Sequence, residues 1–414
     1  MSSFSIPLSG LQASSSSLND IANNLANLNT DGYKDQSLNF ADVFNQMQGN
    51  AGNGDPIQTG SGVLVDGASS NFSNGAISST GVASNMALQG NGFFVVENNN
   101  GQTSYTRTGD FTVNSSGQLS TPEGQLVMGY PAVNGVVSTS GTLSPIAVNQ
   151  ASTLPAVATT SFQTNTNLDS SATVGTTFST PITIYDSLGT SQVLSIQYTN
   201  TASNAWSYNI TLPASATGGT GNPTTIASGS LTFNSSGQLT SPTGSITGIN
   251  IAGLADGAAA MKLTWNLNTS TGTPSITQQD STSATASTTQ NGFGVGSLTD
   301  YSVLPDGVVQ GQFSNGQTLA LGQVAIAGFA NTQGLTQSGN NDFQATFASG
   351  AAVVGQADAG GNGSITGGAV EDSNVDLSTE FSNMIVAQQG YEANAKVLTT
   401  LDQISQATIQ MVSA

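Results

Sequence analysis

The predicted fold is decided by one stretch near the C-terminus, DLSTEFSNMIVAQQGYEANAKVLTTLDQISQATIQMV, residues Asp376–Val412. Its apolar residues recur at helical spacings, so they gather on one side of an α-helix. These residues are Leu377, Phe381, Met384, Ile385, Tyr391, Leu398 and Leu401. No proline interrupts the stretch, and Ser373 followed by Asp376 predicts a capping box at its start. We therefore predict a long C-terminal assembly helix within residues 374–414.

A matching pattern lies at the other end of the chain, within residues 4–28. Its apolar members are Leu11, Leu18, Ile21, Leu25 and Leu28. We predict a helix from about Ser5 to Leu28, with Gly32 suited to a left-handed cap. The serines at 14–17 lower helix propensity, so this helix needs a partner. We expect the two terminal helices to pair in a coiled-coil-like manner, with each other and with other copies. The alternative is a helical hairpin packed on a globular core.

Almost everything between the helices has the pattern of β-structure. Short apolar runs alternate with Asn-Gly, Ser-Gly and Pro-Glu-Gly turns, as in antiparallel sheets. The segment Thr112–Gly124 (TVNSSGQLSTPEG) is nearly repeated at Thr232–Gly244 (TFNSSGQLTSPTG), which indicates a duplicated strand–turn–strand unit. If the two ends pair, the chain must leave one domain, pass through another and return.

The predicted fold class is therefore α+β, mainly β, with paired terminal helices and two nested, discontinuous antiparallel β domains. The inserted outer domain is expected within the inner domain, which is itself inserted between the helices. The expected segments are an N-terminal assembly helix at 1–31, a linker with an extended hairpin at 32–70, the inner β domain at 71–143 and 287–358, the outer β domain at 144–286, a linker at 359–373 and the C-terminal helix at 374–414.

Composition excludes several classes of function. Only 7% of the residues are charged, and four cations against 23 acidic residues give a net charge of −19. That charge argues against binding nucleic acid or an anionic membrane. The chain has no cysteine and no histidine, which removes disulfides, thiolate metal sites and the commonest general base. No apolar run is long enough to insert into a membrane, and the N-terminus lacks the features of a cleavable signal peptide.

Local motifs favour structural roles over catalysis. The segment Gln89–Phe94 resembles a phosphate loop but lacks its third glycine and the following helix, so it predicts a tight entry into a strand. The neighbouring carboxylates Glu371 and Asp372 have no histidine to work with. Arg107, the lone arginine, is predicted to form a structural ion pair or hydrogen bonds. We expect no enzymatic activity and no cofactor.

The combined pattern resembles the bacterial flagellar rod–hook axial proteins. The N-terminal signature is matched at Ser9–Lys34, the middle one at Ala87–Val96 and Tyr105–Pro131, and the C-terminal one at Gly367–Ile404, in the right order. Rod proteins of this family are usually shorter, so the large insertion points to the hook. Gln389 departs from the family pattern, which usually has arginine there.

The resemblance implies a structural subunit of the flagellar hook. Such a subunit would polymerise into a curved, flexible helical tube that transmits torque as a universal joint, with terminal helices lining a central channel. The implied partners are other copies of the chain, the distal rod protein, the hook cap protein, the hook–filament junction protein and the type III export apparatus. The implied location is the extracellular part of the flagellum, reached without a cleaved signal peptide.

Two alternatives remain at this stage. The first is a distal rod protein of the same family, which would form short straight rods. The second is a secreted, β-rich adhesin, which would require a ligand pocket or an anchor that the sequence does not display.

Overall fold

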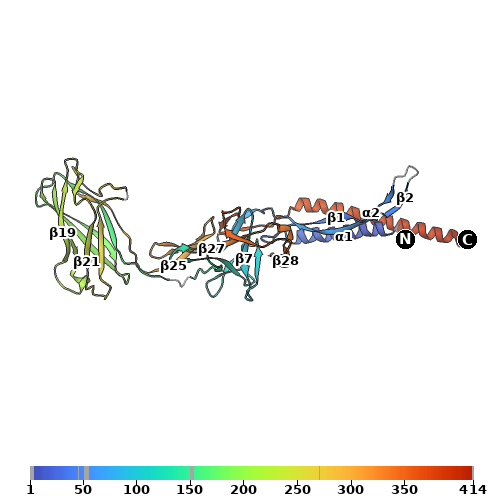
Figure 1. The fold of residues 1–414 in the computed structure, drawn as a ribbon, viewed down its shortest axis with the longest axis horizontal. Coiled ribbons are helices and arrows are strands. Elements are labelled where there is room, and N and C mark those ends of the chain that lie inside the picture. Colours follow the sequence, from blue (N-terminus) through green and yellow to red (C-terminus); the bar gives the residue numbers. More distant parts are fainter. Residues whose placement is uncertain (1–3, 45, 51–55, 150–152, 270, 413–414) are drawn as a thin grey trace. The chain divides into compact units, whose positions relative to one another are not determined.

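The computed structural model describes residues 4–44, 46–50, 56–149, 153–269 and 271–412 (Figure 1). The chain divides into two compact units. The first unit comprises Met1–Asn149, Asp300–Gly311 and Thr318–Ala414, and the second comprises Gln150–Thr299 and Gln312–Gln317. Each unit is thus built from separate pieces of the chain. The fold is mainly β, with one long helix near each end, as the sequence predicts.

Two α-helices of the first unit lie side by side (Figure 1). α1 spans Ser5–Ala26 and α2 spans Leu377–Val412. A long hairpin-like excursion follows α1, in which β1 (Gln36–Asp42) pairs antiparallel with β4 (Val63–Ser70). Within it, β2 (Gln46–Asn50) pairs with β3 (Pro56–Thr59). No helix in the described part of the chain combines the length and the hydrophobicity needed to cross a membrane.

The helix ends differ from the sequence prediction. α1 stops at Ala26, not at Leu28, because the chain turns through Asn27 before Gly32 takes its left-handed φ of 68°. The predicted capping box at the start of α2 is wrong. Asp376 is itself the cap, and its carboxylate accepts a hydrogen bond from the N–H of Thr379 at 2.8 Å. The Ser373 hydroxyl instead accepts a weaker bond from Val375 N–H at 3.4 Å.

The main sheet of the first unit is antiparallel and combines strands from both halves of the chain. Its order is β27 (Thr318–Gly328), β11 (Leu126–Val133), β7 (Phe93–Glu97), β8 (Thr103–Thr106), β29 (Asp342–Gln344) and β28 (Thr336–Gly339). Short flanking strands are β9 (Thr112–Val113), β10 (Leu119–Ser120), β12 (Val136–Val137), β13 (Ser144–Pro145) and β30 (Val353–Gln356). Phe94 and Phe111 meet edge to face in its core, with ring centroids 5.2 Å apart. The segment Gln89–Phe94 is a strand entry, as predicted, since it joins β6 to β7.

Two further strand pairs connect the segment before α2 to this unit. β31 (Ser364–Gly367) pairs with β6 (Met86–Gln89), and β32 (Ala369–Glu371) pairs with β5 (Ile77–Ser79). The sequence prediction treated this segment as a linker. Its glycine-rich composition hid the strands, because their hydrogen-bonding partners lie almost 300 residues away along the chain.

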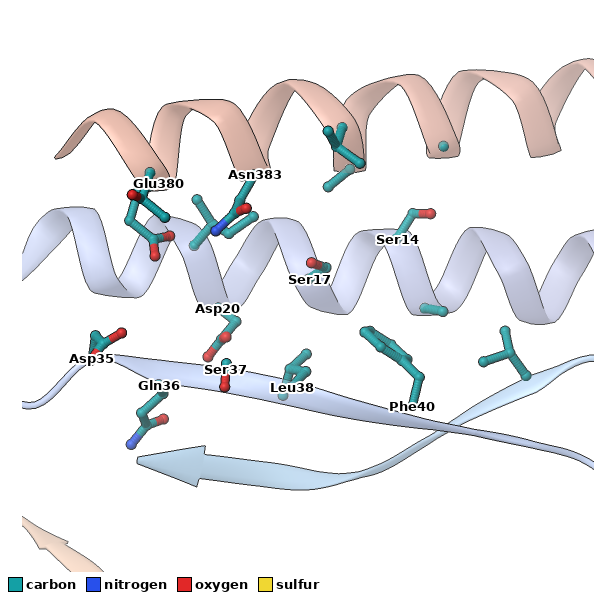
Figure 2. A pocket seen from close by; sticks show the side chains of 17 residues that line it. Ser14, Ser17, Asp20, Asp35, Gln36, Ser37, Leu38, Phe40, Glu380 and Asn383 are labelled. Atoms are coloured by element: carbon teal, nitrogen blue, oxygen red, sulfur yellow. The ribbon is translucent and has the colours of Figure 1, made fainter. Parts of the chain in front are cut away.

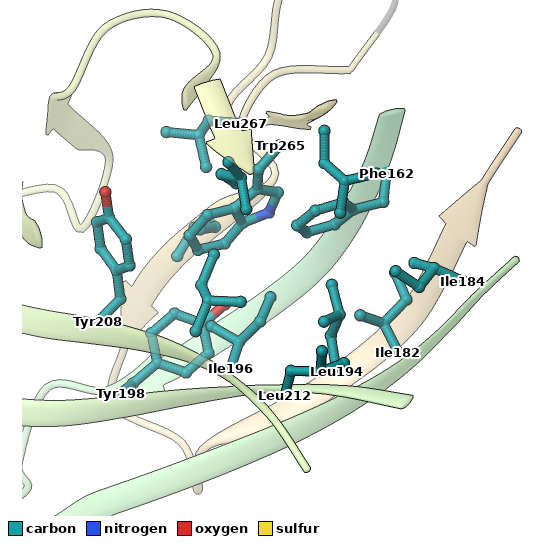
Figure 3. Close-up of a cluster of buried hydrophobic side chains, with 14 of the residues drawn as sticks. Phe162, Ile182, Ile184, Leu194, Ile196, Tyr198, Tyr208, Leu212, Trp265 and Leu267 are labelled. Atoms are coloured by element: carbon teal, nitrogen blue, oxygen red, sulfur yellow. The ribbon is translucent and has the colours of Figure 1, made fainter. Parts of the chain in front are cut away.

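The second unit is a sandwich of two five-stranded sheets around one aromatic core (Figure 3). One sheet comprises β21 (Ile246–Ile251), β22 (Met261–Asn266), β15 (Ser161–Asp169), β23 (Ile276–Gln279) and β24 (Ala284–Gln290). The other comprises β16 (Thr177–Tyr185), β17 (Ser191–Ala202), β18 (Ala205–Leu212), β19 (Thr224–Phe233) and β20 (Leu239–Ser241). Buried and half-buried residues alternate along β15 and β18, and Trp265 stacks on Phe162 with centroids 6.0 Å apart.

The expectation of purely antiparallel sheets is wrong for this sandwich. β15 runs parallel to both β22 and β23. Local turn signals predict only hairpins between consecutive strands, whereas β15 pairs with strands that follow it by about a hundred residues along the chain. The boundaries expected for the outer domain, 144–286, also differ from those of the sandwich. β13 belongs to the sheet of the first unit, and β24 continues to Gln290.

The sheet that contains β27 continues through β26 (Val308–Phe313) and β25 (Gly296–Val303) to β14 (Thr153–Leu154). The 3₁₀-helices are η1 (Ala214–Thr217) and η2 (Thr332–Gly334). β14 pairs with β25, so the two chain crossings into the sandwich run side by side. Beyond this pair, Val157 and Phe293 exchange backbone hydrogen bonds of 3.0 and 2.9 Å. The sandwich therefore begins and ends at one point.

This closure generates a deletion test. Joining Val157 to Phe293 through an Asn-Gly turn, with residues 158–292 removed, requires no rearrangement of the backbone at the junction. We expect the shortened chain to unfold in a single cooperative transition in calorimetry. A broad transition without a cooperative peak would contradict the independence of the sandwich.

Candidate functional site

The terminal helices pack antiparallel along a seam of small and polar residues. Ser14 of α1 faces Gly390 of α2, because a Cβ on Gly390 would lie 3.2 Å from the Ser14 hydroxyl. Four residues back along α1, Gly10 faces Asn394, four residues further along α2. A Cβ on Gly10 would approach the Asn394 side chain to 2.7 Å, so a larger residue here would displace the end of that side chain. Ile21, 5% exposed, is the one large apolar side chain of α1 buried here.

The predicted apolar residues of α1 lie beside this seam. Leu11, Leu18 and Leu25 each follow a residue of the row Gly10, Ser17 and Asn24, which faces α2 or the cleft beneath it. Burial differs accordingly, because Ile21 is buried and Leu11, Leu18, Leu25 and Leu28 are only half-buried.

On α2 the predicted residues also fall into two groups. Met384, Leu398 and Leu401 are half-buried. Four others are exposed, namely Leu377 at 42%, Phe381 at 47%, Ile385 at 54% and Tyr391 at 43%.

The strand β1 approaches one side of the helix pair, where Ala13, Ser17 and Asp20 of α1 line a cleft with Leu38 and Phe40 (Figure 2). None of Leu11, Leu18 and Leu25 lines this cleft. At 100° per residue, Leu11 and Leu18 point about 140–180° away from Ala13 and Asp20. Phe381 and Ile385 are likewise absent from the cleft lining, which includes Asn383 and Gly390 of α2. We call the surface formed by Leu11, Leu18, Leu25, Leu377, Phe381 and Ile385 the apolar face.

The cleft on the β1 side encloses about 530 Å³ and gathers three carboxylates. Asp20 comes from α1, Asp35 from the start of the hairpin and Glu380 from the first turn of α2 (Figure 2). Burial raises the pKa of Asp20, and the charge of Asp35 adds to the increase. Burial also raises the pKa of Glu380, with Asp35 and Asp20 adding and a hydrogen bond with Asn24 opposing. The ammonium of nearby Lys34 is directed elsewhere.

Asn24 attaches α1 to the hairpin. Its amide group donates to the carbonyl of Gln36 at 2.8 Å and accepts from the N–H of Gln36 at 3.0 Å. The hydroxyl of Tyr33 donates to the same Asn24 oxygen at 3.1 Å. Burial and the nearby carboxylates raise the pKa of Tyr33 to about 12, so the hydroxyl remains a donor. Asn24 is 1% exposed, and sequence reasoning missed it because an asparagine in a helix carries no periodic signal.

At the base of the helix pair, Glu371 binds two buried cations. The Lys34 ammonium lies 2.7 Å from Glu371 Oε1, and the Arg107 guanidinium lies 3.6 Å from Oε2. The side chains are at most 2% exposed. The N–H of Gly75 and the amide of Asn74 also donate to Oε1, at 2.8 and 3.2 Å. The chain has only four lysine and arginine residues, so this cluster contains half of its cationic side chains.

The remaining contacts of the two cations are polar or aromatic. Lys34 also donates to the carbonyl of Ser73 at 2.8 Å, and Arg107 donates to that of Gly90 at 2.8 Å. The guanidinium lies over the ring of Phe93, 5.3 Å from its centroid. Burial lowers the pKa of Lys34, although its hydrogen bond to Glu371 opposes the shift. The structural role predicted for Arg107 is confirmed, whereas the role of Glu371 was not foreseen.

Three family models match separate parts of the chain. A flagella basal body rod protein model covers residues 6–34, the flagellar basal body protein FlaE D2 domain covers 153–293, and the flagellar basal body rod FlgEFG protein C-terminal model covers 366–411. The matches include both terminal helices and the sandwich. They define the class of the molecule as an axial protein of the bacterial flagellum.

Full-length relatives narrow this class. The flagellar hook protein FlgE of Salmonella typhimurium is 35% identical over 419 residues, covering 97% of this chain and 98% of the relative. FlgE of Borreliella burgdorferi is 31% identical over 443 residues, covering 98% of each. FlgE of Helicobacter pylori is 38% identical over 231 residues, 55% of this chain but 32% of its own length. The chain belongs to the flagellar hook protein family, whose members are structural subunits of the hook.

The fold is also found in a solved structure. The crystal structure of Helicobacter pylori flagellar hook protein FlgE2 has a TM-score of 0.53 with 17% sequence identity, and the match covers 70% of this chain and 98% of that one. This likeness supports the architecture of the chain.

The buried cluster generates a stability prediction. Glu371→Gln would leave two cations in the interior without a countercharge, which costs about 3–5 kcal/mol of unfolding free energy. Urea denaturation of the monomer measures it. As a control of equal charge change, Asp358→Asn removes an exposed carboxylate and should shift stability by less than about 0.5 kcal/mol. Equal stability of the two variants would contradict a structural role for the cluster.

The acidic cleft generates a pH prediction. The pKa values of Asp20 and Glu380 are raised in the folded chain, so the folded state binds more protons than the unfolded state at intermediate pH. The contribution of these two carboxyl groups to stability is complete below their pKa values in the unfolded chain, near 4. It is lost as the pH rises through their higher pKa values in the folded chain. We expect the helices to melt at a higher temperature at pH 5 than at pH 7, by circular dichroism.

A neutral variant provides the control for this pH effect. Asp20→Asn should raise the melting temperature at pH 7 and reduce its pH dependence. Helices that melt earlier at pH 5 than at pH 7 in the unmodified chain would exclude the proposed carboxylate repulsion.

Proposed function

We propose that this hook subunit polymerises through the apolar face of its paired terminal helices. The observation that carries the proposal is the exposure of large apolar side chains on a helix pair whose own seam is small and polar. Leu377, Phe381 and Ile385 keep 42–54% of their surface exposed in the single chain. Burying the remaining half of each side chain against another copy would contribute about 0.7–1.5 kcal/mol.

The polar seam between the helices supports the proposal that the apolar face serves assembly and not the pairing of α1 with α2. Gly10, Ser14 and Asn394 bring the helices close together but bury little apolar surface. Helix pairs in water draw most of their stability from a buried apolar stripe. The pair therefore acquires its main hydrophobic stabilisation only when other copies cover the apolar face. Assembly and full ordering of the helices would then be coupled.

A tube built in this way would have the helices at its centre and the β-units outside them. We propose that the tube is curved and flexible and transmits torque as a universal joint. The sparse charge of the chain, 7% of residues, supports easy sliding between outer surfaces. Desolvated ion pairs between copies would favour one fixed register. In the described part of the chain both ion pairs are internal, on Glu371.

The other proposed partners follow from the place of a hook between rod and filament. They are the distal rod protein, the hook cap protein, the hook–filament junction protein and the type III export apparatus. We propose export to the cell exterior without a cleaved signal peptide. A rod protein and a β-rich adhesin are less favoured, because the similarity to hook proteins extends over nearly the whole chain.

A charge placed on the apolar face tests the proposal. Ile385→Asp should leave the melting temperature of the monomer unchanged, because the side chain is 54% exposed there. In a polymer each copy would bury an unpaired carboxylate at a cost of several kcal/mol, so no polymer should sediment. The control Ala393→Asp places the same charge on an exposed position of α2 about 80° further round the helix from Ile385. Polymer from Ile385→Asp at the wild-type concentration would refute the role of this face.

A further inference from the structure

One aromatic side chain in the first unit is held entirely in solvent. Phe347 is 105% exposed, more than any other large apolar residue whose exposure the structure describes. It occupies the turn Thr346–Gly350, between β29 and β30. Single exposed apolar residues are common on protein surfaces, but most of them lie partly against their neighbours. Phe347 makes no such contact, so its position requires a separate explanation.

The turn that carries Phe347 is rigid. The Ser349 hydroxyl accepts from the N–H of Thr346 at 2.9 Å, and Ser349 is 0% exposed. The Thr346 hydroxyl accepts from the N–H of Ala348 at 3.1 Å and donates to the carbonyl of Gly334 at 2.5 Å. A Cβ on Gly334 would lie 2.4 Å from the backbone nitrogen of Ser349, so glycine is required beneath the turn.

A rigid, exposed aromatic ring is well suited to be an anchor for another molecule. Aromatic side chains dominate the binding energy of many interfaces when they enter a pocket. A backbone already fixed in the bound conformation loses little entropy on binding. The turn Thr346–Gly350 carries no charged residue, so its burial would not desolvate an ion.

The same unit contains an open pocket of suitable chemistry. It encloses about 830 Å³ and is lined by Tyr130, Phe329, Val353, Val354 and the backbone near Gly361. None of its lining residues is charged. In a chain with a net charge of −19, a contact between copies is least opposed where both surfaces are neutral.

We propose that Phe347 of one copy inserts into this pocket of an adjacent copy. The proposed contact is head-to-tail, and therefore heterologous, so that it can repeat along an open helical assembly. This inference rests on the proposed polymerisation and adds to it a specific contact between the β-units. Adjacent copies would then contact each other through their β-structure as well as through their terminal helices.

The first test compares polymerisation of side-chain variants of the full chain. Phe347→Ser should leave the melting temperature of the monomer unchanged and raise the critical concentration for polymer at least about tenfold. Phe347→Tyr should restore assembly, because the ring is retained. Val136→Ser, at a position that is 70% exposed and outside both the knob and the pocket, should behave like wild type. An unchanged critical concentration for Phe347→Ser would overturn the proposal.

Cross-linking identifies the pocket that receives the ring. The natural chain has no cysteine, so single-cysteine variants form cross-links only between copies. Polymers that mix Ala348→Cys, next to the intact Phe347 ring, with Ala359→Cys, on the pocket rim, should yield dimers with a short bis-maleimide. Ala348→Cys mixed with Val136→Cys should not.

The outcomes separate the two proposals. Dimers from the rim pair alone support the knob and pocket. Wild-type polymer without rim-specific dimers overturns this inference and leaves the proposed function intact. Absence of any wild-type polymer overturns the proposed function, and this inference with it.

Discussion

The buried ion cluster on Glu371 is the constraint on which the first unit depends. Its members come from segments that are distant in sequence, since Lys34 and Glu371 are 337 residues apart. Lys34 leads out of α1, Arg107 follows a strand of the sheet and Glu371 leads into α2. A buried cation without its carboxylate is strongly unfavourable, so the segments must come together or none can be buried. The cluster therefore fixes where both helices leave the β-structure.

In the helix pair above this cluster, the residues that align the helices are different from the large apolar residues that could stabilise them by burial. Gly10 lies against Asn394 of α2, and Asn24 attaches α1 to Gln36 of the hairpin, so both contacts favour one placement of α1. The large apolar side chains are directed elsewhere. The carboxylates of the cleft oppose tight closure at neutral pH, since burial raises the pKa of Glu380 and of Asp20. The single chain is thus specific in its pairing without being strongly stabilised by it.

Much of this architecture could be predicted from periodicity and turns. The two helices are long and regular in pattern, and the strands of the first unit alternate with strong turn signals. The sequence did not reveal which row of α1 faces α2, because Leu18 and Ser17 are adjacent and periodicity alone favours the leucine. It also did not reveal the parallel pairing of β15, which depends on strands that follow about a hundred residues later. The role of Glu371 was hidden for the same reason, since its partners are set by tertiary structure.

The meeting of Val157 and Phe293 has an evolutionary consequence. The chain enters and leaves the sandwich through two strands that are hydrogen-bonded to each other. The geometry of this junction does not depend on the length of the chain between the two strands. A module of another size can therefore replace the sandwich at this point while the backbone of the first unit keeps its course. The relative from Helicobacter pylori, of which only 32% aligns with this chain, shows how far total length varies within the family. Insertions between these two strands lengthen the second unit and leave the strand pairings of the first unit as they are.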